Sequence, residues 1–195
     1  MTDRSKNSLV ARAKDKARRM QRERQSPYAR ILAFLYLGED PGGPKRGAAL
    51  PPGTTHVLNL TNAMTYAAPQ NISVMHFPIA DDGRSAPALM KAAPRLCAFI
   101  DSARDGGGVC FCHCRAGISR SATVVLYYLM SGGAAKENRS TAMSLAAALT
   151  HLKSVRPMVS PNRGFMDALC QAETELRGGT PSVDIACYHQ HRLGK

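Results

Sequence analysis

One loop, between an expected strand and an expected helix, constrains this chain more than any other feature of its sequence. The run Val109–Phe111 is short and apolar, as in a buried strand, and Ala122–Met130 is typical of a helix that ends at Gly132. Between them stand residues 113–121, His-Cys-Arg-Ala-Gly-Ile-Ser-Arg-Ser. A loop that leads from a strand into a helix presents unpaired backbone N–H groups, which bind anions. The sequence therefore predicts an anion site in this loop.

The cysteine and the second arginine of the loop indicate phosphoryl transfer. A cysteine near a helix N-terminus loses its proton easily, so we expect Cys114 to be a thiolate at neutral pH. A thiolate can attack phosphorus and form a covalent phosphoenzyme. The planar guanidinium of Arg120 can hold two phosphoryl oxygens at once, and the loop N–H groups form a nest for the phosphate. We interpret Cys114 as the nucleophile and Arg120 as the phosphate-binding cation.

The remaining loop residues are expected to bind or support the phosphate. Gly117 allows backbone geometry that a side chain would block. Ser121 is expected to donate a hydrogen bond to the Cys114 thiolate when it leaves in the second step, and His113 to fix the loop and favour the thiolate rather than act as a base. The expected substrate-binding residues, besides Arg120, are Arg115, Ala116, Gly117, Ile118 and Ser119.

With this loop, the chain resembles the dual-specificity protein phosphatases, a family of the cysteine-dependent phosphatases. The stretch Ala116–Thr123 is most similar to the form in the mitogen-activated-protein-kinase phosphatases. Four outlying stretches resemble family segments in the right order: residues 35–38, 55–61, 77–81 and 156–165. The likeness covers residues 28–177. It implies a phosphocysteine mechanism that needs neither a metal nor another cofactor.

The same resemblance implies a general acid and a supporting asparagine. The acid protonates the leaving oxygen and then activates water. The family's acid follows a run like Phe77–Ala80, which makes Asp81 the candidate and the adjacent Asp82 the alternative. By resemblance, Asn162 braces the phosphate loop, but capping of the last helix explains it equally well.

Alternating helical and strand-like segments predict an α/β domain with a central mixed sheet flanked by helices. Apolar spacing predicts helices over Pro94–Ala103, Thr141–Val155 and Pro161–Leu176. We expect three parts: a basic, disordered N-terminal arm over residues 1–27, a catalytic domain over 28–177, and a C-terminal tail over 178–195. No apolar run is long enough to span a membrane and no signal peptide is visible, so we expect a cytoplasmic or nuclear protein.

The cysteines are not expected to form a disulfide framework or a metal site. Cys110, Cys112 and Cys114 alternate along one strand, where neighbours are too far apart for an unstrained bridge. Their spacing does not match the paired cysteines of zinc sites. Oxidation of Cys114, with Cys112 or another nearby cysteine as a disulfide partner, is a hypothesis that the sequence leaves open. The run Cys187–His191 offers metal-binding side chains, but an unstructured tail explains it better.

The net charge of +12 is concentrated at the N-terminus, where residues 1–30 hold ten basic and three acidic residues. The sequence leaves open whether this arm serves solubility alone, nuclear import, or contact with an acidic surface such as the docking groove of a protein kinase. Contact with nucleic acid or lipid has no further support. The chain has no tryptophan, which the acid loop of tyrosine-specific phosphatases carries, so a shallow, dual-specificity pocket is expected.

The predicted function is hydrolysis of phosphotyrosine and phosphoserine or phosphothreonine in proteins. Two alternatives remain open. One is a phosphoinositide or RNA 5′-phosphatase with the same mechanism. The other is a catalytically idle module that only binds phosphorylated ligands, although neither the nucleophile, nor the arginine, nor the acid is missing from the sequence.

Overall fold

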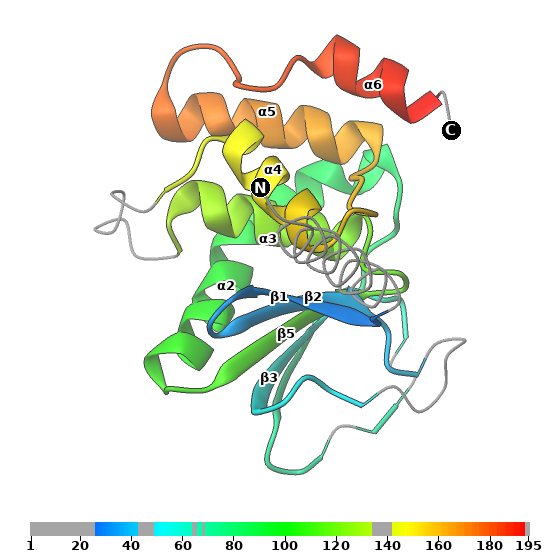
Figure 1. The fold of residues 1–195 in the computed structure, drawn as a ribbon, viewed down its shortest axis with the longest axis vertical. Helices are drawn as coiled ribbons and strands as arrows, with labels where there is room; N and C mark the ends of the chain where they lie inside the picture. Colours follow the sequence, from blue (N-terminus) through cyan, green and yellow to red (C-terminus); the bar gives the residue numbers. More distant parts are fainter. Residues whose placement is uncertain (1–25, 43–48, 64–65, 68, 134–141, 194–195) are drawn as a thin grey trace, which may run out of the picture.

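A five-stranded mixed sheet carries the helices of the molecule (Figure 1). The computed structural model describes residues 26–42, 49–63, 66–67, 69–133 and 142–193. The basic stretch Met1–Gln25 of the expected arm lies outside these residues. The strands are β1 (Tyr28–Leu32), β2 (Leu35–Glu39), β3 (Thr54–Asn59), β4 (Ser73–His76) and β5 (Val109–Cys114).

The strand order is β1-β2-β5-β3-β4, which places β5 in the centre. Only β1 is antiparallel, through the short connection to β2; β5 is parallel to both of its neighbours and β3 is parallel to β4. Consequently the carboxyl ends of β5, β3 and β2 meet at one edge of the sheet, where open α/β folds hold their ligands. The expected α/β class with a central mixed sheet is confirmed.

The helical elements are a short 3₁₀-helix η1 (Gly83–Ser85) and the helices α2 (Ala86–Asp105), α3 (Arg120–Ser131), α4 (Leu145–Val155), α5 (Arg163–Arg177) and α6 (Ile185–Leu193). They gather on one side of the sheet, with α3 between the sheet and α5 and with α6 on the outer side of α5 (Figure 1). No helix among the described residues is long and apolar enough to cross a membrane.

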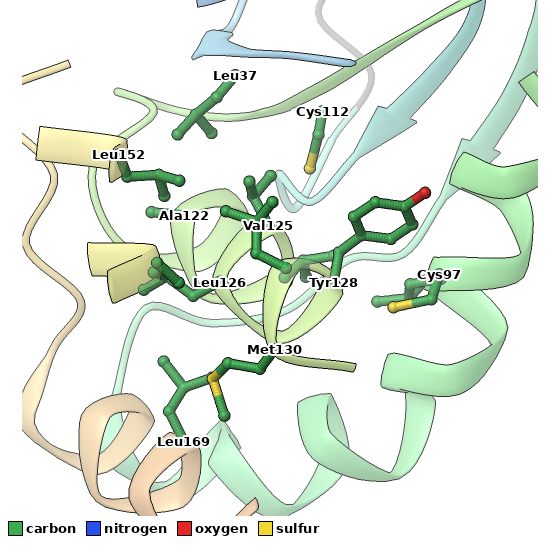
Figure 2. Close-up of a cluster of buried hydrophobic side chains, with 14 of the residues drawn as sticks. Leu37, Cys97, Cys112, Ala122, Val125, Leu126, Tyr128, Met130, Leu152 and Leu169 are labelled. Carbon is green, nitrogen blue, oxygen red and sulfur yellow. The ribbon is translucent and has the colours of Figure 1, made fainter. Parts of the chain in front are cut away.

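The core lies between the sheet and this helical layer. Figure 2 shows Leu37 and Cys112 from the sheet facing Val125 of α3. Ten of the twelve residues of α3 are buried, which its apolar composition predicted. Because α3 is packed on all sides, its N-terminal turn, which begins at Arg120, is fixed against the end of β5.

Two sequence predictions about the helices need correction or extension. Helix α2 begins at Ala86, not at Pro94, because Pro87 already occupies its first turn and the buried positions Leu89 and Ala93 extend the apolar stripe. Pro94 therefore lies inside the helix, on its exposed face, rather than in its first turn. The tail expected from residue 178 contains helix α6, which the sequence analysis did not anticipate.

Candidate active site

Cys114 is the last residue of β5 and its side chain is almost completely buried. Its Sγ accepts a hydrogen bond from the hydroxyl of Ser121, at 3.1 Å, in the first turn of α3. The chain thus leaves the sheet, closes a loop of five residues and returns beside the sulfur in a helix. The loop predicted from the sequence therefore brings Cys114, Arg120 and Ser121 together.

The carbonyl groups of the loop point away from its centre. The Arg115 carbonyl accepts a hydrogen bond from the Asp40 amide, and the Ile118 carbonyl accepts one from the Ser160 amide. The carbonyls of Ala116 and Gly117 accept from Nη2 and Nε of Arg156. In a planar trans peptide the following N–H points opposite to the carbonyl. The N–H groups of residues 116–119 are thereby directed to the inside of the loop, where they form a nest for an anion.

Gly117 makes this close packing possible. Its φ is +62°, a conformation that side chains disfavour. A Cβ at this position would also collide with the carbonyl group of Gly38 in β2 and lie 2.9 Å from Arg156 Nη2. The glycine expected from the motif is thus required both by its backbone conformation and by the approach of the sheet.

Arg156 is a functional residue that the sequence analysis did not single out. It is buried and holds two loop carbonyls, those of Ala116 and Gly117, at 2.9 Å each. Burial lowers the pKa of its guanidinium group. In the sequence, only its place before Pro157, in the segment that resembles the family, marked it.

Arg120 is held by two backbone carbonyls and lies beside Asp81. Its Nη1 donates to the carbonyls of Ile79, at 3.1 Å, and Leu60, at 3.4 Å. Its Nε is buried and has no hydrogen-bond partner among the described residues; Asp81 Oδ2 lies 3.7 Å away. A buried donor without a hydrogen-bond partner is costly in free energy.

His113 is buried at the end of β5 and its Nε2 lies 2.8 Å from the hydroxyl of Tyr66. Burial lowers the imidazole pKa to about 4. The ring is thus neutral at neutral pH, so any support that it gives the thiolate does not come from a positive charge on the ring. Its contacts with Tyr66 and Phe111 hold the strand end in place. Tyr66 was not foreseen because its partner is 47 residues away.

Asp81 lies at the loop and is oriented by two side chains. Its Oδ1 accepts from Ser119 Oγ, at 2.6 Å, and from Asn162 Nδ2, at 2.9 Å. Its side chain remains 39% exposed, so a substrate and water can reach it. Ser119, which was expected to bind substrate through the loop, uses its hydroxyl to orient Asp81.

Asp82 has a different task from its neighbour. Its Oδ1 accepts from the amide and the hydroxyl of Ser85, each at 2.9 Å, and so caps η1. These hydrogen bonds lower the pKa of its carboxyl, and Arg84 adds to the effect. Asp82 therefore caps η1, whereas Asp81 contacts Ser119 of the loop.

Asn162 performs both of the roles that the sequence left open. Its Oδ1 accepts from the Phe165 amide and caps α5, while its Nδ2 donates to Asp81. Its own amide donates to Ser119 Oγ, and the preceding Ser160 amide donates to Ile118 O. We call residues 160–162 the strap, because this segment ties the loop and the acid to the start of α5.

The segment that carries the acid also contacts α5 directly. Gly83 of η1 packs backbone to backbone against Gly164. A cavity of about 510 Å³ lies next to this contact, among residues of η1, α2, α3 and α5. Cys114 is not among its lining residues. Within the described part of the chain, no group of three or more His, Cys, Asp or Glu side chains is placed to hold a metal ion.

Comparisons with known proteins show what the chain is similar to. The family profile described as "Dual specificity phosphatase, catalytic domain" matches residues 35–175. Human dual specificity protein phosphatase 5 is 34% identical over 152 residues, which cover 78% of this chain and 37% of that protein. Mouse dual specificity protein phosphatase 1 is 32% identical over 80% of this chain and 41% of its own length. The chain thus spans about two fifths of the length of these relatives.

A shorter relative is matched over most of its length. Human dual specificity phosphatase 28 is 29% identical over 82% of this chain and 88% of that protein. Its crystal structure superposes with a TM-score of 0.64, covering 77% of this chain and 95% of the solved chain. The site residues Cys114 and Arg120 lie within the matched region.

Proposed function

The chain belongs to the dual specificity phosphatase family, and on this premise we propose that it hydrolyses phosphotyrosine, phosphoserine and phosphothreonine in proteins through a phosphocysteine at Cys114. One observation carries the proposal. The Cys114 sulfur lies at the centre of a loop whose N–H groups point inward, beside a buried arginine and within reach of an exposed carboxyl group.

In the first step the Cys114 sulfur attacks phosphorus opposite the leaving oxygen. The S–P bond forms and the P–O bond breaks while Asp81 gives its proton to the leaving oxygen. The inward N–H groups and Arg120 stabilise the three equatorial oxygens, where the charge of the transferring group lies.

In the second step water attacks the phosphocysteine and gives its proton to the Asp81 carboxylate. The S–P bond breaks, inorganic phosphate is released and the sulfur leaves as a thiolate. The Ser121 hydroxyl, 3.1 Å from the sulfur, donates to the negative charge that returns to it. Ser119 and Asn162 keep Asp81 in place through both steps.

The proposed substrate is a phosphorylated protein. Protein kinases are one proposed class of substrate, because the positive charge of residues 1–27 would attract an acidic docking surface. The proposed location is the cytoplasm or the nucleus.

The experiment is hydrolysis of an aryl phosphate by the wild-type protein and by Cys114→Ser, with a chelator present. We expect turnover that the substitution abolishes and that the chelator does not affect. Phosphopeptides, phosphoinositides and 5′-triphosphorylated RNA, compared by kcat/KM in the same assay, separate the substrate classes. A folded wild-type protein that binds phosphopeptides without turning over any of these compounds contradicts the proposal and favours the binding module.

A further inference from the structure

Helix α6 lies beyond residue 175, where the family match ends, yet it packs against the body of the domain. Val183, Ile185 and Tyr188 are partly buried against the hydrophobic core. Asp184 fixes the start of the helix, since its carboxylate accepts from the Cys187 amide at 3.0 Å. His189 Nε2 lies 3.0 Å from Asp167 of α5 and adds a polar contact between the two helices. These contacts place the Tyr188 ring over the start of α5.

The hydroxyl of Tyr188 donates a hydrogen bond to the carbonyl of Pro161, at 3.0 Å. The ring itself is held by packing and by Lys153, whose Nζ lies 5.7 Å from its centroid. Pro161 is buried and is the middle residue of the strap. The hydrogen bond therefore joins α6 to the strap at a single backbone atom.

The residues on either side of Pro161 contact the catalytic groups. On one side, the Ser160 amide holds the loop carbonyl of Ile118 at 2.9 Å. On the other side, Asn162 holds Asp81 through its side-chain amide. The Pro161 carbonyl and the Asn162 amide belong to one planar peptide unit, so a displacement of this carbonyl also moves Asn162. Two hydrogen bonds, from Tyr188 to Pro161 and from Asn162 to Asp81, thus connect α6 with the acid.

We propose that Tyr188 is a positioning residue for the reaction, acting through Pro161 and Asn162 to keep Asp81 in line with the leaving oxygen. The inference rests on the proposed function. It places a determinant of turnover in a helix outside the matched catalytic region. Loss of the hydroxyl is expected to lower kcat about three- to tenfold, the size that one net neutral hydrogen bond allows.

A double-mutant cycle tests the inference. Wild type, Tyr188→Phe, Asp81→Asn and the double variant are compared by kcat and KM on phenyl phosphate, a substrate whose leaving oxygen needs a proton. We expect Tyr188→Phe to lower kcat with little change in KM in the wild-type background, and to have no further effect when Asp81 is absent. With an aryl phosphate whose phenol is strongly acidic, the effect of Tyr188→Phe is expected to disappear, since that leaving group needs no proton.

Tyr128→Phe is the matched control. It also removes a tyrosine hydroxyl, which donates to Asp101 at 2.7 Å, but at the far end of α3 from the loop. We expect it to lower the melting temperature and leave kcat unchanged. An unchanged kcat in Tyr188→Phe, or an equal loss with and without Asp81, overturns the inference while wild-type turnover upholds the proposed function. A wild type without Cys114-dependent turnover overturns both.

Discussion

Ser119 and Ser121 lie two residues apart, yet their hydroxyl groups donate hydrogen bonds to different groups of the site. Ser121 donates to the sulfur of Cys114, and Ser119 donates to the carboxylate of Asp81. One loop thus prepares both the leaving group of the second step and the acid of the first step. The roles of the two adjacent aspartates are separated in the same way, since one faces the loop and the other caps η1.

At this scale, we predict that Asp81→Asn lowers kcat on phenyl phosphate about a hundredfold or more, because the leaving oxygen then departs without a proton. The affinity for inorganic phosphate should stay unchanged. Asp82→Asn is the matched control, since an asparagine side chain also caps a helix. Steady-state kinetics decide between them: a large loss in Asp82→Asn with full activity in Asp81→Asn would reverse the assignment.

The motif predicted Cys114, Arg120, Gly117 and Ser121 because their chemistry depends on spacing along the chain. Arg156 and Tyr66 escaped the prediction because their partners, Gly117 and His113, lie about forty residues away, and only the folded chain pairs them. The sequence does not show which acceptor the Ser119 hydroxyl meets, and in the folded chain this acceptor is Asp81.

Among the elements, η1 and the start of α5 approach closely at Gly83 and Gly164, next to the segment that carries Asp81. A Cβ on Gly164 would collide with Gly83 Cα and lie 2.8 Å from the Gly83 carbonyl oxygen. A Cβ on Gly83 would lie 3.3 Å from Gly164 Cα, which is tight but needs only a small adjustment. A methyl group on Gly164 would therefore displace η1, whereas a methyl group on Gly83 would displace its neighbours only slightly.

We predict that Gly164→Ala lowers kcat about tenfold or more, with a larger loss on poor leaving groups, because it pushes η1 and with it Asp81 away from the loop. Gly83→Ala should have a clearly smaller effect. The ratio of kcat for phenyl phosphate and for an aryl phosphate with an acidic phenol measures the loss of acid catalysis. Equal activities in both variants would show that the η1–α5 contact does not position the acid.

Element boundaries were predicted well where apolar spacing and a stop signal coincide. Helix α5 ends next to Gly178, as expected. The predicted start of α2 is wrong because a proline favours the first turn of a helix, whereas Pro94 lies inside α2. Helix α6 has a polar sequence and is held by tertiary contacts of Tyr188 and His189, which spacing along the chain does not reveal.

For the whole molecule, burial of His113 in the centre of the sheet links folding to pH. Burial lowers its pKa from 6.5 to about 4, so between these values the unfolded chain binds a proton that the folded protein does not. Stability is then lost as pH falls from 6.5 towards 4. His56, whose pKa burial also lowers, acts in the same direction.

We predict that the free energy of unfolding falls by about 2 kcal/mol between pH 7 and pH 5 through His113 alone. Urea unfolding at the two pH values measures the change, and His113→Asn provides the comparison, since it has no proton to bind in this range. The variant should be less stable at pH 7 but less sensitive to pH. An equal pH dependence of both proteins would show that His113 is not buried in its neutral form.

Capture of the covalent intermediate tests the central claim most directly. Ser121→Ala should slow the return of the negative charge to sulfur and let the phosphoenzyme accumulate; Ser131→Ala, the same change at the other end of α3, should not. Each protein is mixed with an aryl phosphate, quenched in acid within the first turnovers and analysed by intact mass and peptide mapping. The account predicts one phosphoryl group, on Cys114, in Ser121→Ala. Turnover with no phosphorylated protein, or with the phosphoryl group on another residue, would contradict it.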